Sequence, residues 1–291
     1  MEKYQCIHEM GSGSYGTVFR AVHKPSGETV AVKMMRRCYD SWEECLSLRE
    51  VKALLKLKNH PNIIRLKEIV LQNQQLFFIF GFMDCDLLQL MKQRRSLNQV
   101  FSESEIRHWC FQVFQGLAYM HEQGYFHRDL KPENLLVKGD KIKIADFGFA
   151  RETNGQPPYT VYVMSRWFRA PEVLLQSNTY SSKVDMWSMG AIMAELYIFR
   201  PLFPGTSDAD QMLKICKIIG PPTVECWSEG MDLARKLGYE FPKCGSMNFS
   251  LLLGTASKEA VSLIRSLCSW DPSKRPSAAE ALQHPFFQSL R

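Results

Sequence analysis

The sequence lacks the cysteine spacing that a disulfide scaffold or a zinc site requires. Its nine cysteines form no C-x-x-C pair, and their number is odd. We therefore expect free thiols, mostly buried, in a protein of a reducing compartment, with neither a disulfide framework nor structural zinc. The cysteines are Cys6, Cys38, Cys45, Cys85, Cys110, Cys216, Cys226, Cys244 and Cys268.

Long apolar runs are also absent. No window approaches the roughly 20 consecutive apolar residues of a membrane span. The first six residues, Met-Glu-Lys-Tyr-Gln-Cys, lack the apolar core of a signal peptide. No internal repeat and no low-complexity segment is present. These absences predict no membrane association and a cytoplasmic or nuclear location.

Only a small excess of one charge sign is present. The 291 residues include 36 Lys and Arg against 30 Asp and Glu, which gives a net charge of +6. The hydrophobic fraction of 45% is typical of a soluble globular protein, so a disordered tail, a collagen-like fibre and a coiled coil are excluded. The basic residues are spread along the chain without an arginine–aromatic ladder, and we expect no nucleic-acid partner.

Short β-rich runs dominate the first hundred residues. Strands are predicted at 4–10, 18–23, 29–34, 63–70 and 75–82, with Gly, Ser and Pro between them. The run Ser41-Trp42-Glu43-Glu44 fits a capping box, which predicts one helix from there to about Lys58. The small sheet should end near residues 83–87.

Helical periodicity dominates the remainder. Ser102 is predicted to cap a long helix that Gly124 ends, and 135–137 with 141–144 form a hairpin. Residues 184–197 are the most apolar stretch and predict a buried core helix. An α+β chain with two lobes follows from this order.

Glycines are concentrated between the first two strands. The segment Gly11-Ser12-Gly13-Ser14-Tyr15-Gly16-Thr17-Val18 contains G-x-G-x-x-G-x-V, and glycines let a backbone approach phosphate oxygens closely. In a dinucleotide-binding fold the last glycine of this pattern opens a helix, whereas here a β-rich run follows. A phosphate-binding turn is predicted, with a plain hairpin as the alternative.

One lysine ends an apolar strand. Lys33 follows Val30-Ala31-Val32, a place where a charge is costly unless it is paired. Glu50, in the predicted helix, is the candidate partner, and an ammonium held by a carboxylate can contact phosphate oxygens as a fixed charge. A lysine that reaches solvent is the alternative.

The strongest local pattern is His127-Arg128-Asp129-Leu130-Lys131-Pro132-Glu133-Asn134, with Asp146-Phe147-Gly148 after the predicted hairpin. Asp129 offers a carboxylate that can accept a hydroxyl proton, and Lys131 can neutralise charge on a transferring phosphoryl group. Asn134 and Asp146 supply hard oxygen ligands that suit Mg²⁺. A solvated polar loop explains the first run but not the second.

Taken in order, with Ala170-Pro171-Glu172 after them, these motifs resemble the eukaryotic protein kinases over essentially the whole chain. The resemblance implies one bilobal kinase domain over 1–291, with an N-lobe at 1–82, a hinge at 83–86 and a C-lobe at 87–291. It also implies that Asp185 braces the catalytic loop and that Glu172 pairs with Arg275.

The resemblance further implies an ATP-dependent kinase that uses Mg²⁺. Lys33, Glu50, Asp129 and Lys131 would act in catalysis, and Asn134 and Asp146 would hold the metal. The residues expected to contact the nucleotide are Met10, Gly11, Ser12, Gly13, Ser14, Tyr15, Gly16, Thr17, Val18, Ala31, Lys33, Phe80, Gly81, Met83 and Leu136.

Several segments indicate which group of protein kinases the chain resembles. Lys131-Pro132-Glu133-Asn134 is similar to the serine/threonine form, and the segment 165–172 with an insert at about 221–253 is similar to the CMGC group of cyclin-dependent and mitogen-activated kinases. Within that group, Trp42-Glu43-Glu44-Cys45 and Pro157-Pro158-Tyr159-Thr160 resemble the male-germ-cell-associated and ciliary kinase branch. This likeness implies a monomer acting on protein substrates with proline after the acceptor and a basic residue upstream, with the cilium or flagellum as a further location.

The resemblance also implies regulation by an upstream activating kinase, through phosphorylation of Thr160 and Tyr162. Val161 stands between them, where the branch usually has an acidic residue, and Gly81 replaces a common glutamate. The arginines that match the phosphate-binding cluster are Arg49, Arg128 and Arg151. The residues expected at the substrate are Ser165, Arg166 and Arg169, and the last two would also meet a phosphate on Tyr162.

Two other classes stay open as alternatives. A pseudokinase scaffold would share the fold without the activity, although the presence of Lys33, Asp129, Asn134 and Asp146 argues against it. A nicotinamide-dependent oxidoreductase conflicts with the β-rich run after Gly16. The chain ends soon after Phe287, and we expect relatives to carry a longer tail.

Overall fold

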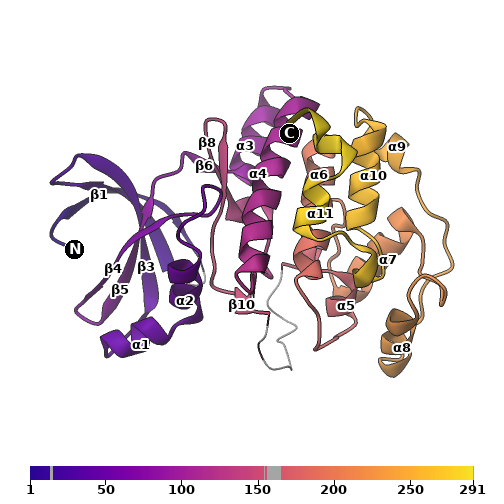
Figure 1. Ribbon diagram of the computed structural model, residues 1–291, viewed down its shortest axis with the longest axis horizontal. Helices are drawn as coiled ribbons and strands as arrows, with labels where there is room; N and C mark the ends of the chain where they lie inside the picture. Colours follow the sequence, from indigo (N-terminus) through magenta and orange to yellow (C-terminus); the bar gives the residue numbers. More distant parts are fainter. Residues whose placement is uncertain (14–15, 154, 156–164, 291) are drawn as a thin grey trace.

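In the computed structural model, described for residues 1–13, 16–153, 155 and 165–290, five antiparallel strands form a sheet in the order β1-β2-β3-β5-β4 (Figure 1). The strands are β1 (Tyr4–Ser12), β2 (Gly16–His23), β3 (Glu28–Cys38), β4 (Leu66–Gln72) and β5 (Gln75–Gly81). The predicted α+β fold is confirmed: this sheet and two short helices make a small lobe beside a larger, mostly helical one.

Apolar side chains cover both faces of the sheet. On one face, Val30, Val32 and Ile79 are buried beneath partly buried residues that include Tyr4 and Phe19. The other face packs against the helices α1 (Trp42–Ser47) and α2 (Arg49–Lys56). Alternation along each strand therefore produces two separate small cores.

The predicted single helix from Ser41 to Lys58 is wrong, because Leu48 separates α1 from α2 with φ −59° and ψ 134°. Leu48 and Cys45 pack into the cluster beneath the sheet, so tertiary packing overrides local propensity. The predicted capping box is half formed. Ser41 accepts from the Glu44 N–H, but the Glu44 carboxylate accepts from the N–H of Asp40.

The predicted strand at 63–70 begins three residues later, at Leu66. Ile63 instead forms a parallel bridge with Ile144. The N–H of Ile144 donates to Asn62, and the N–H of Ile64 donates to Ile144. This segment therefore joins the small lobe to the hairpin of the large lobe.

In the described part of the chain, the large lobe contains five short strands, which form three antiparallel pairs, and the remaining helices. Its strands are β6 (Cys85–Asp86), β7 (Tyr125–Phe126), β8 (Leu135–Lys138), β9 (Lys141–Ile144) and β10 (Arg151–Glu152). Its α-helices are α3 (Leu87–Ser96), α4 (Glu103–Glu122), α5 (Pro171–Leu174), α6 (Lys183–Ile198), α7 (Asp208–Ile219), α8 (Ser228–Lys236), α9 (Phe249–Leu253), α10 (Lys258–Leu267) and α11 (Ala278–Leu282). Its 3₁₀ helices are η1 (Pro132–Asn134), η2 (Arg166–Phe168), η3 (Pro272–Lys274) and η4 (Pro285–Leu290).

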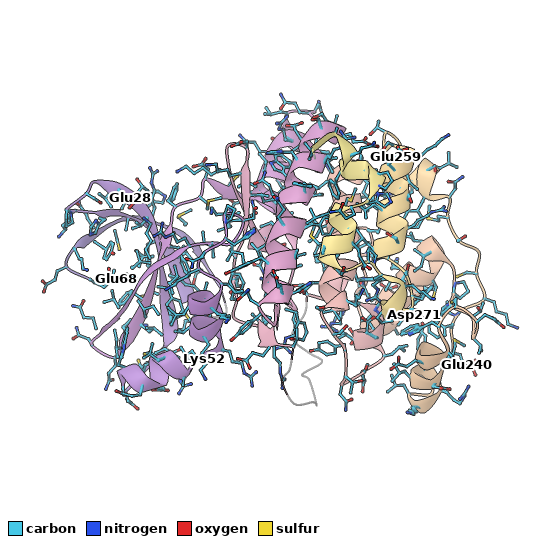
Figure 2. All side chains as sticks on the ribbon, in the orientation of Figure 1. Glu28, Lys52, Glu68, Glu240, Glu259 and Asp271 are labelled. Carbon is cyan, nitrogen blue, oxygen red and sulfur yellow. The ribbon has the colours of Figure 1, made fainter. Side chains whose placement is uncertain are left out.

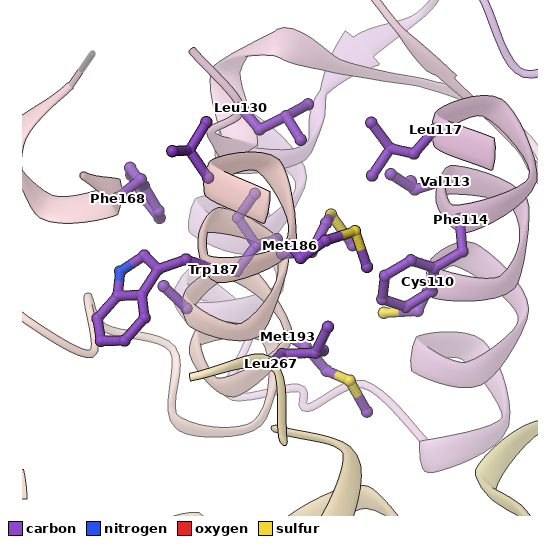
Figure 3. Close-up of a cluster of buried hydrophobic side chains, with 14 of the residues drawn as sticks. Cys110, Val113, Phe114, Leu117, Leu130, Phe168, Met186, Trp187, Met193 and Leu267 are labelled. Atoms are coloured by element: carbon purple, nitrogen blue, oxygen red, sulfur yellow. The ribbon is translucent and has the colours of Figure 1, made fainter. Parts of the chain in front are cut away.

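The core of this lobe lies where α4, α6 and α10 meet. Figure 3 shows Val113 and Leu117 of α4, Met186 and Met193 of α6, and Leu267 of α10 around one buried region. Helix α6 is buried nearly all round, as its apolar composition predicts. Asp185, which lies in the first turn of α6, is therefore anchored in a helix that is buried nearly all round.

Charged side chains mark the surface. Glu28, Glu240 and Glu259, which Figure 2 labels, are exposed, and Glu68 and Asp271 are partly exposed. Among the described residues no helix combines the length and apolar character that crossing a membrane would need.

All nine cysteines are free, but the expectation that most are buried is wrong. Four are buried, and Cys6, Cys38 and Cys226 are exposed.

Candidate active site

The first half of the candidate site lies on one face of the five-stranded sheet. The strand register sets Val18 opposite Lys33, and Ala31 opposite Phe80. Residues directly opposite in an antiparallel pair share a face, and Ala31 and Lys33 are two residues apart on one strand. Four of the residues expected at the nucleotide therefore point to the same side.

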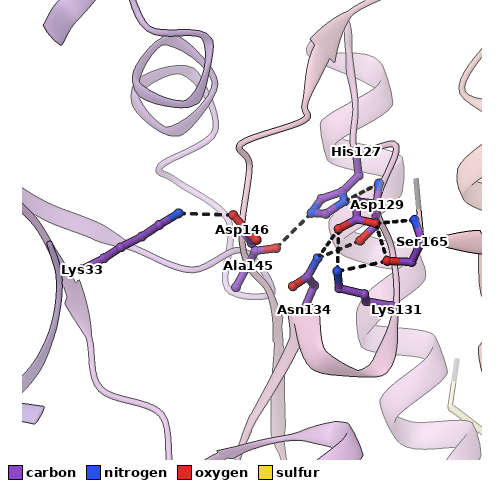
Figure 4. Close-up of polar contacts among 8 residues, drawn as sticks. All are labelled: Lys33, His127, Asp129, Lys131, Asn134, Ala145, Asp146 and Ser165. Atoms are coloured by element: carbon purple, nitrogen blue, oxygen red, sulfur yellow. Dashed lines mark hydrogen bonds and ion pairs between the residues drawn. The ribbon is translucent and has the colours of Figure 1, made fainter. Parts of the chain in front are cut away.

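Lys33 connects the two lobes through its ammonium group. Its Nζ donates to Glu50 Oε1 at 2.7 Å. It also donates to Asp146 Oδ1 at 3.2 Å, as Figure 4 shows. Burial alone would lower the pKa of Lys33, but the two carboxylates outweigh it and raise that pKa. Lys33 is thus a fixed positive charge beside the segment Asp146-Phe147-Gly148.

Asp146 keeps its negative charge in this setting. Burial would raise the pKa of its carboxyl, but the charge of Lys33 and the hydrogen bond that Lys33 donates lower that pKa below its usual value. Its backbone has φ 61°, in the left-handed region that a residue with a side chain rarely adopts. This conformation turns the carboxylate toward Lys33.

The glycine segment begins where β1 pairs with β2. The Gly13 N–H donates to the Gly16 carbonyl at 2.9 Å. A Cβ on Gly16 would lie 2.1 Å from the Met34 carbonyl oxygen, so only glycine allows this approach of β2 to β3. Ser14 and Tyr15, which the sequence places at the nucleotide, lie outside the described residues.

The connection between the lobes carries the other expected nucleotide contacts. The Gly81 N–H donates to the Arg65 carbonyl at 3.2 Å, so it is not available to a base. Met83 is buried in the core of the large lobe, and Leu136 pairs with Asp86 across β6 and β8. Met10 lies on β1 and is 40% exposed.

Asp129 is the centre of the second half of the site. Its carboxylate accepts from Lys131 Nζ at 2.8 Å, and from both the N–H and the Oγ of Ser165 at 2.9 Å (Figure 4). Lys131 also donates to Ser165 Oγ at 3.1 Å. The carboxylate is buried yet held by cationic and hydroxyl donors, an arrangement suited to receiving a proton from a substrate hydroxyl.

Asn134 and Asp146 fit a magnesium ion. The Asn134 amide nitrogen donates to the Asp129 carbonyl at 2.8 Å and to its carboxylate at 3.2 Å, which turns the amide oxygen away from Asp129. Among the described residues no group of three or more His, Cys, Asp or Glu side chains could hold a metal. Mg²⁺ needs few protein ligands when phosphates and waters complete its shell, so one carboxylate and one amide are suitable.

Asp185, in the first turn of α6, accepts hydrogen bonds from the loop that carries Asp129. Its carboxylate accepts from the N–H groups of His127 and Arg128 at 2.8 and 2.9 Å, and from His121 Nε2 at 2.9 Å. Burial would raise its pKa, but the hydrogen bond and charge of His121 lower it. Arg128 has φ 71° between these contacts and Asp129. The expected bracing carboxylate is present.

His127 and Phe147 pack against each other beside Asp129 and Asp146. His127 Nε2 donates to the Ala145 carbonyl at 2.9 Å, while its Nδ1 accepts from the Asp129 N–H at 3.2 Å. Its ring meets Phe147 edge-on at 5.4 Å, and both side chains are fully buried. The expected Glu172–Arg275 pair is also present, with two contacts of 2.7 Å.

The expected regulatory residues are only partly described. Thr160 and Tyr162 lie outside the described residues. Arg128 is buried and donates to the Phe149 carbonyl and to Tyr180. Arg151 lies opposite Phe126 in the pair of β10 and β7, and Arg49 is exposed at the start of α2.

Two acidic residues near the site escaped the sequence analysis. Arg166 and Arg169, expected at the substrate, both donate to Asp208 Oδ1, at 2.9 and 3.0 Å. Glu195 is a buried carboxylate of α6. Glu195 could have been noticed in the sequence, because it is a glutamate inside the most apolar stretch. For Asp208 the sequence offers only its place directly after Ser207, the residue that caps α7.

The protein kinase domain family model matches residues 4–287, and the chain therefore belongs to this family. The match covers both halves of the site described above.

Named relatives agree with this assignment. The chain is 58% identical over 288 residues to a rice protein named cyclin-dependent kinase F-4. This match covers 99% of the present chain and 62% of the rice protein. It is 52% identical over 289 residues to the rat serine/threonine-protein kinase MAK and 51% identical to the rat serine/threonine-protein kinase ICK. These matches cover 99% of this chain but 46% and 45% of the two rat proteins. The predicted likeness to the male-germ-cell-associated kinase branch is confirmed.

Proposed function

We propose that this chain is a protein serine/threonine kinase that transfers the γ-phosphoryl group of ATP to a hydroxyl of a protein substrate. The observation that carries the proposal is the meeting of two charge networks, Lys33–Glu50–Asp146 and Asp129–Lys131–Ser165, on either side of Asn134. Serine/threonine kinases among the relatives support it.

In this mechanism the substrate hydroxyl gives its proton to Asp129 while its oxygen bonds to the γ-phosphorus and the bond to ADP breaks. Lys33 holds phosphate oxygens, and Lys131 neutralises charge that develops on the transferring group. Mg²⁺, held by Asn134 and Asp146, would supply charge neutralisation at the phosphates when bound. Residues 1–82, 83–86 and 87–291 would act as N-lobe, hinge and C-lobe, with the sheet ending at Gly81.

The proposed switch is phosphorylation of Thr160, with Tyr162 as a second site. A phosphate adds about −2 charge and attracts arginines. Arg128 and Arg151 support this role, since Arg128 lies over the ring of Phe126, the residue opposite Arg151. Arg49, at the start of α2, would couple the phosphate to the helix that carries Glu50.

The decisive assay uses the purified chain, Mg-ATP and two peptides with Pro or Ala after the acceptor serine. We expect phosphoryl transfer that excess EDTA abolishes and added Mg²⁺ restores, with about tenfold higher kcat/KM for the Pro peptide. A chain that binds ATP but transfers nothing would instead be a pseudokinase scaffold. Equal rates for both peptides would remove the proline-directed part of the proposal.

A basic residue upstream of the acceptor would be attracted by a group of carboxylates, one of which is buried. Glu195 is 3% exposed, and its Oε2 has no hydrogen-bond partner among the described residues. Burial, together with the charge of Glu133, raises the pKa of Glu195 to about 7. Burial raises the pKa of Asp86, and the charge of Glu133 raises it further. These neighbouring carboxylates favour a cation near the catalytic loop.

Glu195→Gln should reduce the preference for a peptide with Arg before the acceptor over one with Gln by about tenfold at pH 8. In the unsubstituted chain this preference should grow between pH 6 and pH 8, because Glu195 loses its proton near pH 7. The measurement is the ratio of kcat/KM for the two peptides. Glu259→Gln, at an exposed site on α10, is the control. An unchanged ratio in Glu195→Gln would assign the preference elsewhere.

A further inference from the structure

Positive side chains surround the connection between the two lobes. The guanidinium of Arg20, on β2, lies over the ring of Phe82 at 5.1 Å, and the ammonium of Lys138, on β8, lies 6.0 Å from the centre of the same ring. The N–H of Gly81 donates to the carbonyl of Arg65 at 3.2 Å, which places Arg65 beside the same connection. Cations from both lobes therefore meet at this point of the chain.

The hairpin of β8 and β9 adds two more cations. It lies between the sheet and α4 in Figure 1, and its register sets Lys138 directly opposite Lys141, with Lys143 two residues further along β9. Opposite residues of a strand pair share a face, as do alternate residues of one strand, so the three lysines lie on one face of the hairpin. The ammonium of Lys143 donates to the carbonyls of Pro61 and Ile63, just before Arg65.

Carboxylates do not balance these charges. The basic cluster, as we name it, consists of Arg20, Arg65, Lys138, Lys141 and Lys143, and none of its members forms an ion pair with a described residue. Burial lowers the pKa of Lys143, and the charges of Lys141 and Arg65 lower it further, as expected of like charges that lie close together. The exposed carboxylates of the connection and of the hairpin are Asp84 and Asp140, which are too few to neutralise the cluster.

A cavity of about 460 Å³ adjoins the basic cluster through Arg65, which is one of its lining residues. Val30 and Leu66 give it an apolar part, while both of its carboxylates already accept from lysines. These pairs are Glu28 with Lys67, at 2.6 and 2.7 Å, and Glu68 with Lys3, at 2.8 Å. In the part of the chain that the structure describes, the guanidinium of Arg65 has no such partner. The cavity thus offers apolar surface beside an exposed cation.

We propose that the basic cluster and this cavity form a docking surface for an acidic segment of a protein partner, whose carboxylates lie at Arg65, Lys138 and Lys141. Like charges that lie close together repel one another, and an anionic partner removes that repulsion when it binds. The apolar part of the cavity fits a peptide side chain, and the net charge of +6 is small for a protein that binds nucleic acid. The inference goes beyond the proposed phosphoryl transfer and does not depend on it.

The test measures the affinity of a fluorescein-labelled peptide with three glutamates on each side of one leucine, by fluorescence anisotropy in about 0.05 M NaCl. A peptide in which glutamine replaces every glutamate is the reference, and it should bind about tenfold more weakly. The triple variant Arg65→Gln, Lys138→Gln, Lys141→Gln should bind the Glu peptide about tenfold more weakly than the unsubstituted chain, because three exposed charge pairs are lost. In about 0.5 M NaCl this difference should shrink, since salt screens exposed charges.

A second triple variant separates this surface from the overall charge of the protein. Lys236, Lys243 and Lys258 are exposed in the large lobe, and replacing all three with glutamine removes the same total charge. The affinity for the Glu peptide should then stay unchanged. An equal loss of affinity in both triple variants, or no loss in the first, would overturn the proposal.

A single substitution keeps the test valid if the first triple variant does not fold. Lys141→Gln, at the exposed end of the hairpin, should weaken binding of the Glu peptide about twofold, whereas Lys258→Gln should not change it. Equal affinities of these two single variants would contradict the inference.

A fluorescein-labelled oligothymidylate with six phosphates tests the other class of polyanion. The unsubstituted chain should bind it about tenfold more weakly than the Glu peptide, because a phosphate backbone has no apolar side chain for the cavity. Binding as tight as that of the Glu peptide, with the same loss in the first triple variant, would show a surface for nucleic acid and would overturn the assignment of a protein segment.

Discussion

Replacing Asp129 with asparagine is expected to lower the phosphoryl-transfer rate about a thousandfold, because the amide cannot take the proton of the substrate hydroxyl. The affinity for ATP should stay nearly unchanged, because the substitution leaves Lys33, proposed to hold the phosphates, and Asp146, proposed to hold the metal, in their ion pair. Initial rates with a saturating peptide measure kcat, and a fluorescent nucleotide analogue measures binding.

Asparagine keeps the size of the side chain and an oxygen that can accept from Ser165. Asp140→Asn, in the exposed turn between β8 and β9, is the matched control and should retain the full rate. A purified Asp129→Asn protein that phosphorylates the peptide at the normal rate would exclude Asp129 as the base.

The largest expected effect on stability belongs to the ion pair of Glu172 and Arg275. The side chains are 4% and 0% exposed, and the guanidinium makes two contacts of 2.7 Å with the carboxylate. Glu172→Ala would leave a buried charge unpaired against Trp187, and we expect a loss of about 3–5 kcal/mol in the free energy of unfolding. The midpoint of urea unfolding, followed by tryptophan fluorescence, measures this loss.

An exposed ion pair supplies the comparison. Asp232→Ala breaks the pair with Arg235, whose side chains are 54% and 75% exposed, and it should change the free energy of unfolding by less than about 1 kcal/mol. Similar urea midpoints for the Glu172→Ala and Asp232→Ala proteins would show that the buried pair does not stabilise the fold.

The sequence predicted those parts of the site in which one residue type is chemically required. Lys33 could be paired with Glu50 from the sequence, because a charge at the end of an apolar strand needs a counter-charge. The long helix ending before Gly124 and the hairpin over 135–144 follow from local periodicity and turn chemistry, and both are present.

Features set by contacts between distant segments could not be predicted. The break at Leu48 depends on packing beneath the sheet, and the late start of β4 depends on pairing of Ile63 with Ile144, 81 positions along the chain. Asp208 is one carboxylate among many until the fold sets it against Arg166 and Arg169. No periodicity or motif in the sequence predicts such contacts between distant segments.

The hydrogen bonds of Asp185 also determine how two peptide N–H groups of the loop that carries Asp129 become exposed to water. Two peptide N–H groups of the catalytic loop end on this one fully buried carboxylate, and that carboxylate belongs to the most buried helix of the protein. The loop cannot expose those N–H groups to water while α6 stays packed. Their exchange with deuterium is therefore governed by the cooperative opening of the large lobe, although the loop itself has little regular secondary structure.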